Sequence, residues 1–236
     1  MKTDAGAFRD SGELTSLPDL LAGRYTCRAF RDTQVARSTI EQILQIARLT
    51  PSWCNTQPWR LTITEGAATR RFADALYAHA SQFDRTGNPD FAFPQRYSGV
   101  YDARRRQVGS QLYDSIGIEH GDRAAAQRQR LENFRMFGAP HVAIITTDRE
   151  LGVYGAVDCG GFVNNFLLAA HSLGVATAPQ ASLAAFPDFI RDHFGLAEDR
   201  LLVCGLSFGY AEEDKAINSF RTDRAEIAAF AEFKSD

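Results

Sequence analysis

The sequence has few cysteines and no histidine pattern that is typical of a metal site. Its four cysteines, Cys27, Cys54, Cys159 and Cys204, are widely separated and form no C-x-x-C pair. We therefore interpret them as small buried side chains. The five histidines show neither H-x-x-x-H nor H-E-x-x-H spacing, so we expect no bound metal.

The chain also lacks a basic excess and a long apolar run. Its 236 residues carry a formal net charge of −3, whereas general nucleic-acid binders are usually basic. No segment resembles a signal peptide. The most apolar stretch, residues 160–175, contains Asn164, Asn165 and His171 and is too short to span a bilayer. We expect a cytoplasmic protein that binds neither nucleic acid nor membranes.

Two nucleotide-binding motifs are missing, and one hydrolase motif is incomplete. Neither G-x-G-x-x-G nor a Walker A sequence occurs, so a Rossmann site or P-loop has no support. The stretch GLSFG, residues 205–209, fits G-x-S-x-G, which requires a strand, a sharp turn, a helix and a later histidine. The last histidine, His193, precedes Ser207. We therefore predict that Ser207 lies within a continuous strand and is not a nucleophile.

Apolar periodicity and turn residues predict one domain in which helices cover a small sheet. We expect strands near residues 60–66, 140–147, 175–179 and 200–211. We expect helices near residues 16–23, 38–49, 67–84, 97–136, 150–174, 186–195 and 224–230. Ser38 and Glu41 predict a capping box, and Ser16 and Asp122 predict further helix caps.

Two arginines stand four residues apart in RYTCRAF, residues 24–30. If this segment is extended, Arg24, Thr26 and Arg28 lie on one face, with the arginines about 13 Å apart. That spacing suits a ligand with a phosphate at one end and a polar ring at the other, because a guanidinium binds phosphate and stabilises negative charge. The alternative is a pair of solvated surface charges.

Polar side chains also gather in PSWCNTQPW, residues 51–59. Ser52, Asn55 and Gln57 match the carbonyl and N–H groups of a ring, and Trp53 adds apolar area. The alternative is an amide-rich turn beside core tryptophans. Two later segments add candidates: the backbone of residues 178–183 and the arginines of NSFRTDR, residues 218–224.

Taken in order, these segments resemble the FMN-dependent nitroreductase family. The family motif R-R-S-x-R-x-F is matched by Arg24, Tyr25, Thr26, Arg28 and Phe30. The motif A-P-S-x-x-N-x-Q-P-W is matched by Pro51, Ser52, Asn55, Gln57, Pro58 and Trp59. A central-helix motif is matched by Asp158, Gly160, Asn165, Leu168, Ala170, Leu173 and Gly174, and a strand-end motif by Gly209 and Tyr210. The match runs from about Leu17 to Phe233; Tyr25, Thr26 and Trp53 depart from the usual residues.

The resemblance implies an α+β three-layer sandwich with a mostly antiparallel central sheet, forming an intertwined homodimer that holds FMN at its interface. Residues 1–236 would be a single domain. Residues 85–136 would be a variable cover over the site, and residues 212–236 a tail that reaches the partner subunit.

The resemblance also implies the site. The residues implied to bind FMN are Arg24, Tyr25, Thr26, Arg28, Pro51, Ser52, Trp53, Asn55, Gln57, Pro179, Gln180, Ala181, Ser182, Arg221 and Arg224. Within this set, Arg24 and the tail arginines, above all Arg221, would hold the phosphate, and Arg28 would stabilise the reduced ring near N1. Our own candidates for contact with the acceptor are Trp53, Tyr97, Tyr101 and Arg105. For the two tyrosines the alternative is packing on a helix surface.

The implied activity is ping-pong reduction of a nitroaromatic or quinone-like acceptor by NAD(P)H. The flavin N5 would carry the chemistry, with no catalytic acid or base from the protein. The arginines at positions 104–106 suggest a carboxylated acceptor as one hypothesis. Reductive dehalogenation, enoate reduction and flavin breakdown remain alternatives on the same scaffold. A flavin-binding module without turnover is the alternative from another class.

Overall fold

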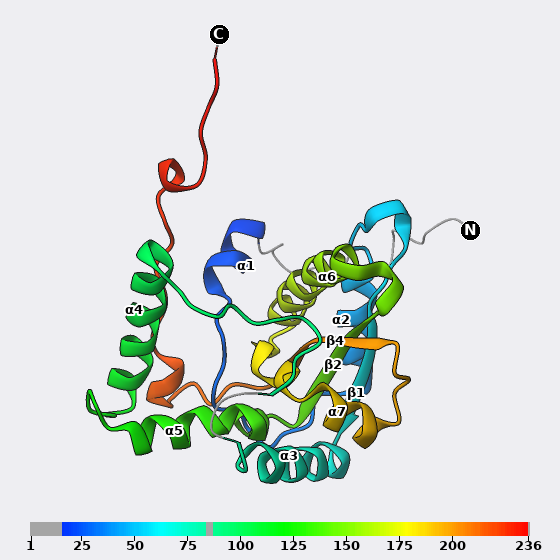
Figure 1. The fold of residues 1–236 in the computed structure, drawn as a ribbon, viewed down its shortest axis with the longest axis horizontal. Helices are drawn as coiled ribbons and strands as arrows, with labels where there is room; N and C mark the ends of the chain where they lie inside the picture. Colours follow the sequence, from blue (N-terminus) through cyan, green and yellow to red (C-terminus); the bar gives the residue numbers. More distant parts are fainter. Residues whose placement is uncertain (1–15, 84–86, 236) are drawn as a thin grey trace.

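A four-stranded antiparallel sheet lies at the centre of the part of the chain that the computed structural model describes, residues 16–83 and 87–235 (Figure 1). The strands are β1 (Arg60–Glu65), β2 (His141–Asp148), β3 (Ala176–Gln180) and β4 (Arg200–Gly209), in the spatial order β1-β2-β4-β3. All three pairings are antiparallel. The predicted strands and the antiparallel sheet are confirmed.

Helices cover both faces of this sheet, because its central strands are apolar on both sides. Side chains alternate along β2, so Val142 and Ile144 pack into one apolar cluster while Ala143 and Ile145 pack into another. Side chains of α3 (Ala67–Ala80) and α7 (Pro187–Phe194) pack into the first cluster. Side chains of α2 (Arg37–Ala47) and α6 (Gly152–Ser172) pack into the second. The result is the predicted three-layer sandwich.

Three further helices lie around the sandwich. The short helix α1 (Leu17–Gly23) contacts α6, while α4 (Gly99–Ser115) and α5 (Arg123–Leu131) form an arm to one side (Figure 1). No residue of α4 or α5 is buried. Within the described residues, no helix combines the length and apolarity that a bilayer crossing requires.

Three helix ends test the sequence predictions. Ser16 and Asp122 accept hydrogen bonds from the backbone N–H groups of Asp19 and Ala125, as expected of N-caps. The predicted capping box is wrong: α2 begins at Arg37, so Ser38 lies inside the first turn and cannot cap it. The helix expected near residues 224–230 is only a 3₁₀ turn over Ile227–Ala229.

The cysteines are mostly but not all buried. Burial raises the pKa of the Cys27 thiol to about 11 and those of Cys159 and Cys204 to about 12, which keeps all three protonated at neutral pH. Cys54 contradicts the expectation of a buried side chain, because it is exposed in the loop after α2.

Ser207 lies in the interior of β4, as predicted. Its side chain is fully buried, and its hydroxyl donates a hydrogen bond to the Gln180 side-chain oxygen on β3. β4 runs without a break to Gly209, and no helix begins there. The geometry of a nucleophile elbow is therefore absent.

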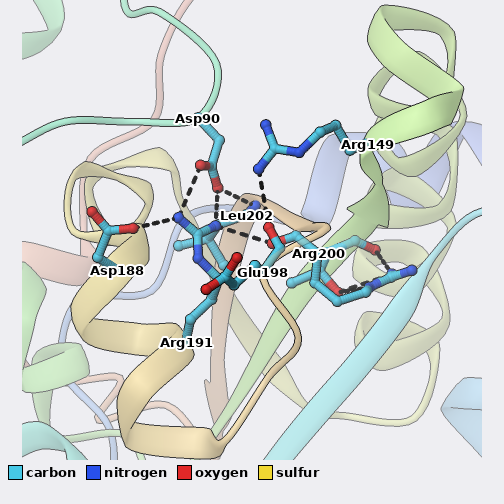
Figure 2. Close-up of polar contacts among 8 residues, drawn as sticks. Asp90, Arg149, Asp188, Arg191, Glu198, Arg200 and Leu202 are labelled. Carbon is cyan, nitrogen blue, oxygen red and sulfur yellow. Dashed lines mark hydrogen bonds and ion pairs between the residues drawn. The ribbon is translucent and has the colours of Figure 1, made fainter.

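A carboxylate covers the part of β4 that extends beyond β3. The backbone N–H of Leu202 donates to Asp90 Oδ2 at 2.7 Å (Figure 2). The same carboxylate accepts two hydrogen bonds from the Arg191 guanidinium, at 2.7 and 3.1 Å. The Arg191 and Asp90 side chains are only 12% and 10% exposed. Asp90 thus protects an open strand edge and anchors the chain leading into the α4–α5 arm.

A buried histidine joins three segments of the fold. His141 Nε2 accepts from the backbone N–H of Val35 at 3.0 Å, and Nδ1 lies 3.2 Å from the carbonyl oxygen of Thr64. Both contacts are satisfied when Nδ1 carries the only ring proton. The ring also stacks on Phe208, with 5.0 Å between centroids. The fold therefore holds this imidazole in its neutral form.

This arrangement predicts a pH-dependent stability. Burial lowers the pKa of His141 in the folded protein, so the unfolded chain binds a proton that the folded chain excludes. The contribution is fully present above the unfolded pKa of about 6.5 and is lost as pH falls below it, by roughly 1 kcal/mol per pH unit. Urea midpoints at pH 7.5 and 5.5 should show this loss, and His141→Gln should reduce it. Equal losses in both proteins would contradict the assignment.

Candidate active site

Four arginines from the two ends of the described chain line a single cavity of about 330 Å³. The lining residues are Leu21, Ala22, Arg24, Tyr25, Thr26, Arg28, Val108, Phe220, Arg221, Thr222 and Arg224. This set of described residues contains no carboxylate. The cavity is therefore strongly positive and suited to an anionic ligand.

The first wall is the segment RYTCRAF, which is extended as predicted. Thr26 bridges Thr177 of β3, and the backbone N–H of Cys27 donates to the Thr177 carbonyl at 2.9 Å. Cys27 and Phe30 are buried, whereas Arg24, Thr26 and Arg28 reach the cavity. The sheet edge thus sets the spacing of the two arginines.

Arg24 is incompletely satisfied without a ligand. Its Nε atom is buried and has no hydrogen-bond partner. Burial, and then repulsion from Arg224, lower the pKa of its guanidinium. A buried donor beside a second cation is costly unless an anion accepts from it. This arrangement fits a phosphate group.

Arg28 is fixed by the tail through a residue that the sequence did not single out. Asn218 Oδ1 accepts from the backbone N–H of Arg28 at 2.7 Å, and its amide donates to the carbonyls of Ala29 and Glu212. The Arg28 guanidinium lies 5.6 Å from the centre of the Phe220 ring. Asn218 belongs to the NSFRTDR stretch, but only the folded structure reveals this clamp.

The two tail arginines have different surroundings. Arg221 lies over the Tyr25 ring at 3.8 Å and donates to the carbonyls of Asn218 and Phe220. Arg224 donates to the Thr222 side chain at 2.8 Å and is close enough to Arg24 to lower its pKa. Arg224 is therefore the better placed of the two to share an anion with Arg24.

The loop expected to meet the flavin ring does not line this cavity. The backbone N–H of Trp53 donates to Asp158 at 3.1 Å, near the start of α6. The cavity lies beside the other end of α6, where Arg24 influences His171. Asp158 and His171 are 13 residues apart, or about 20 Å along a helix. Within one chain, the structure does not bring Pro51, Ser52, Trp53, Asn55 or Gln57 to the arginines.

That loop is nevertheless held in one conformation. Cys54, Asn55 and Gln57 have φ values of 50°, 56° and 47°, in the left-handed region that non-glycine residues seldom adopt. Ser52 Oγ accepts from the backbone N–H of Gln57 at 2.9 Å, and the Gln57 amide donates to Asn55 Oδ1 at 3.1 Å. Trp53 stays 61% exposed, in edge contact with Tyr154. Such strained, exposed loops are typical of functional sites.

The segment Pro179–Ser182 also lies outside the cavity. Pro179 and Gln180 pair with β4, and the buried Gln180 amide donates to the Asn133 carbonyl at 2.8 Å. Ser182 donates to Asn133 Oδ1 at 3.1 Å, while Ala181 is exposed. Both polar side chains are thus engaged within the chain, which leaves the backbone for a ligand.

Of the four candidate acceptor residues, Trp53 lies in the loop just described, and the other three lie on α4 or shortly before it. Tyr97 and Tyr101 are exposed, and the Arg105 guanidinium lies 5.7 Å from the centre of the Tyr97 ring. Arg105 also pairs with Asp102 at 2.9 Å. It faces a separate cavity of about 400 Å³ between α4 and α5, which Asp114, Glu119 and Asp122 also line. The basic rim suggested by the sequence is therefore largely neutralised.

The arginine-lined cavity lies between the N-terminal segment and the tail of a sandwich fold, and its charge suits an anionic group such as a phosphate. The chain matches the model of the Nitroreductase family over residues 21–210, and it belongs to this family. The family and fold expected from the motifs are thereby confirmed.

Two curated relatives cover most of the chain. Nitroreductase NfnB of Mycolicibacterium smegmatis is 36% identical over 218 residues, which are 91% of each protein. The 4-nitrobenzoate reductase of Pseudomonas putida is 35% identical over 215 residues, 91% of this chain and 93% of that protein.

Solved structures agree with this assignment. The FMN-dependent nitroreductase NfnB from Mycobacterium smegmatis in complex with NADPH has a TM-score of 0.86 at 35% identity, over 92% of this chain and 97% of its own. The FMN and NADPH-dependent nitroreductase NfnB from Sphigopyxis sp. strain HMH has a TM-score of 0.89 at 30% identity, over 94% of this chain and 100% of its own.

Proposed function

We propose that the protein is an FMN-dependent NAD(P)H oxidoreductase that reduces nitroaromatic compounds. The observation that carries the proposal is the cavity of four arginines, in which Arg24 keeps a buried, unpaired Nε. The relatives named as FMN-dependent nitroreductases and as a nitrobenzoate reductase support the same function. When bound, FMN supplies the hydride-transfer chemistry.

The chain's own residues bind and orient the cofactor. Arg24 and Arg224 would hold the phosphate, whereas the sequence favoured Arg221 as the partner of Arg24. The repulsion between Arg24 and Arg224 supports this revision, because an anion between them would relieve it. Thr26 and Tyr25 line the path between them and Arg28. Arg28 presents a fixed positive charge to the ring end. Arg221 secures the tail against Tyr25.

We further propose that the site is completed in a homodimer. Leu49, Trp53, Val153, Tyr154 and Val157 are exposed apolar side chains around the loop of residues 51–57 and the start of α6. The tail carries Ile227, Phe230 and Phe233, also exposed, and leaves the body beyond α4 (Figure 1). Both surfaces suit burial against a second copy. The loop and the backbone of Pro179–Ser182 would then approach the flavin ring.

The acceptor side follows from the same arrangement. Trp53, Tyr97 and Tyr101 offer exposed aromatic faces for an electron-poor ring. Arg105 would bind an acceptor carboxylate only by exchanging its present partner, Asp102. The arm of α4 and α5 would cover the site. We further propose that the protein is cytoplasmic. Quinone-like compounds would be additional acceptors.

Purification and anaerobic titration test this function. The protein should be yellow, lose its flavin colour on addition of NADPH or NADH, and regain it when nitrobenzene or 4-nitrobenzoate is added. A yellow protein that neither nucleotide bleaches would be a binding module without turnover. Recovery with a halogenated phenol or an enoate, but with neither nitroaromatic, would indicate the alternative reductase activities.

A further inference from the structure

His171 lies close behind Arg24, at the end of α6. A Cβ atom placed on Gly23 would lie only 2.7 Å from His171 Nε2. Glycine at position 23 therefore permits the imidazole to abut the end of α1, directly before Arg24 in the chain. No motif of the sequence assigns this histidine a role, because it occupies a variable position of the central-helix pattern.

Arg24 lies between two cavities. The larger cavity, already described, contains Arg224 but not His171. A smaller one of about 180 Å³ contains His171 and Glu213 but not Arg224, and Arg24 and Tyr25 line both. Arg24 thus shares one cavity with Arg224 and the other with His171.

We propose that His171 is a positioning residue for Arg24, and that its protonation sets how tightly the arginine cavity holds the phosphate of the flavin. The inference rests on the proposed function, because it takes FMN as the ligand of that cavity. It gives the FMN affinity a pH dependence that the arginines alone cannot provide, since they stay charged at all physiological pH values.

The charges around His171 determine whether FMN affinity rises or falls with pH. Burial, and then Arg24, lower the pKa of His171, so the imidazole is neutral at neutral pH before a ligand binds. A phosphate dianion at Arg24 and Arg224 offsets their positive charge and makes the imidazolium less costly. Binding therefore takes up a proton, and by linkage the affinity for FMN rises as pH falls.

The other groups around the imidazole have definite effects on the protonation of His171. Gly23 brings no charge, and the Tyr25 phenol has a raised pKa and stays neutral. Glu213, across the smaller cavity, favours the imidazolium. Among the described charged groups, Arg24 is thus the one that opposes protonation of His171. The ligand phosphate would compensate the charge of this same arginine.

The test is the dissociation constant of FMN for the flavin-stripped full chain, from flavin fluorescence between pH 8.0 and 6.5. Wild type should bind FMN about 3- to 10-fold more tightly at the lower pH, since one pKa unit of coupling corresponds to tenfold. His171→Gln should flatten this dependence. Riboflavin, which lacks the phosphate, should bind with little pH dependence to both proteins. The second ionisation of phosphate, near pH 6, affects both proteins equally.

Two further variants separate positioning from packing. Gly23→Ala should displace the imidazole and flatten the same profile with His171 still present. His120→Gln, on the loop between α4 and α5, is the matched control and should keep the wild-type profile. An unchanged profile in His171→Gln, or an equal profile for riboflavin, would overturn the proposal. A wild-type chain that binds no FMN would overturn the proposed function as well.

Discussion

Replacement of Arg24 by alanine should yield a nearly colourless protein. Arg24 has a buried Nε with no acceptor among the described protein atoms, and it lines the same cavity as Arg224. Charge-assisted hydrogen bonds contribute about 1.5–3 kcal/mol each, so the loss of two to the phosphate should weaken FMN binding about 100-fold or more. Flavin fluorescence titration of the stripped protein measures this change directly.

A second ligand, riboflavin, and a control variant show whether the loss of affinity is specific to the phosphate and to Arg24. Riboflavin affinity should change much less than FMN affinity, because riboflavin has no phosphate. Arg128→Ala, an exposed position on α5, should bind FMN as wild type does. Arg28→Ala should also shift the reduction potential of the bound flavin downward, since a fixed cation favours the reduced, anionic ring. A yellow, fully active Arg24→Ala/Arg28→Ala double variant would refute the site.

Replacement of Asp90 by alanine should destabilise the fold strongly. Asp90 accepts from the Leu202 backbone and from both terminal nitrogens of Arg191, and the pair is almost fully buried. Breaking a buried ion pair typically costs about 3–5 kcal/mol, and because Arg191 keeps its ion pair with the exposed Asp188 at 2.6 Å, we expect a loss near the lower end of this range. For a chain of this size, the melting temperature should fall by on the order of 10 °C. Urea unfolding and calorimetry measure both quantities.

The matched control is Asp102→Ala on α4. Asp102 pairs with Arg105 and Arg106, but these arginines are 54% and 75% exposed. Solvent screens such exposed pairs, so this variant should stay close to wild type. Adding Arg191→Met to Asp90→Ala should restore little stability, because Arg191 also pairs with Asp188 and donates to the Arg200 carbonyl, and both contacts are lost with it. Similar losses in the two single variants would show that burial of the Asp90 pair is not the cause.

Local patterns predicted most of the fold. Each strand was recognised from its apolar residues, and alternation along RYTCRAF placed Arg24, Thr26 and Arg28 on the cavity side. The errors were local as well. A capping box at Ser38 was plausible, but the chain begins its helix one residue earlier at Arg37, whose side chain pairs with Glu65. The N-cap position is therefore Ala36, which makes no side-chain capping hydrogen bond.

The site was less predictable, because it depends on contacts between distant segments. No local pattern indicates that Asn218 would hold Arg28, 190 residues earlier, or that Asp90 would bind Arg191. The sequence also could not show that residues 51–57 contact α6 at Asp158, about 20 Å along the helix from His171, which lies near Arg24. Such relations arise only when the sheet brings the segments together, or separates them.

The composition of the arginine cavity has a consequence for biosynthesis. Arg24 and Arg28 leave the ribosome early, whereas Arg221 and Arg224 are translated almost 200 residues later. A nascent chain therefore carries only half of the cavity's cations, and the tail that supplies Asn218 and Phe220 is still missing. In the proposed site, cofactor loading would therefore be a late event, and flavin colour would distinguish chains translated past Arg224 from prematurely terminated ones.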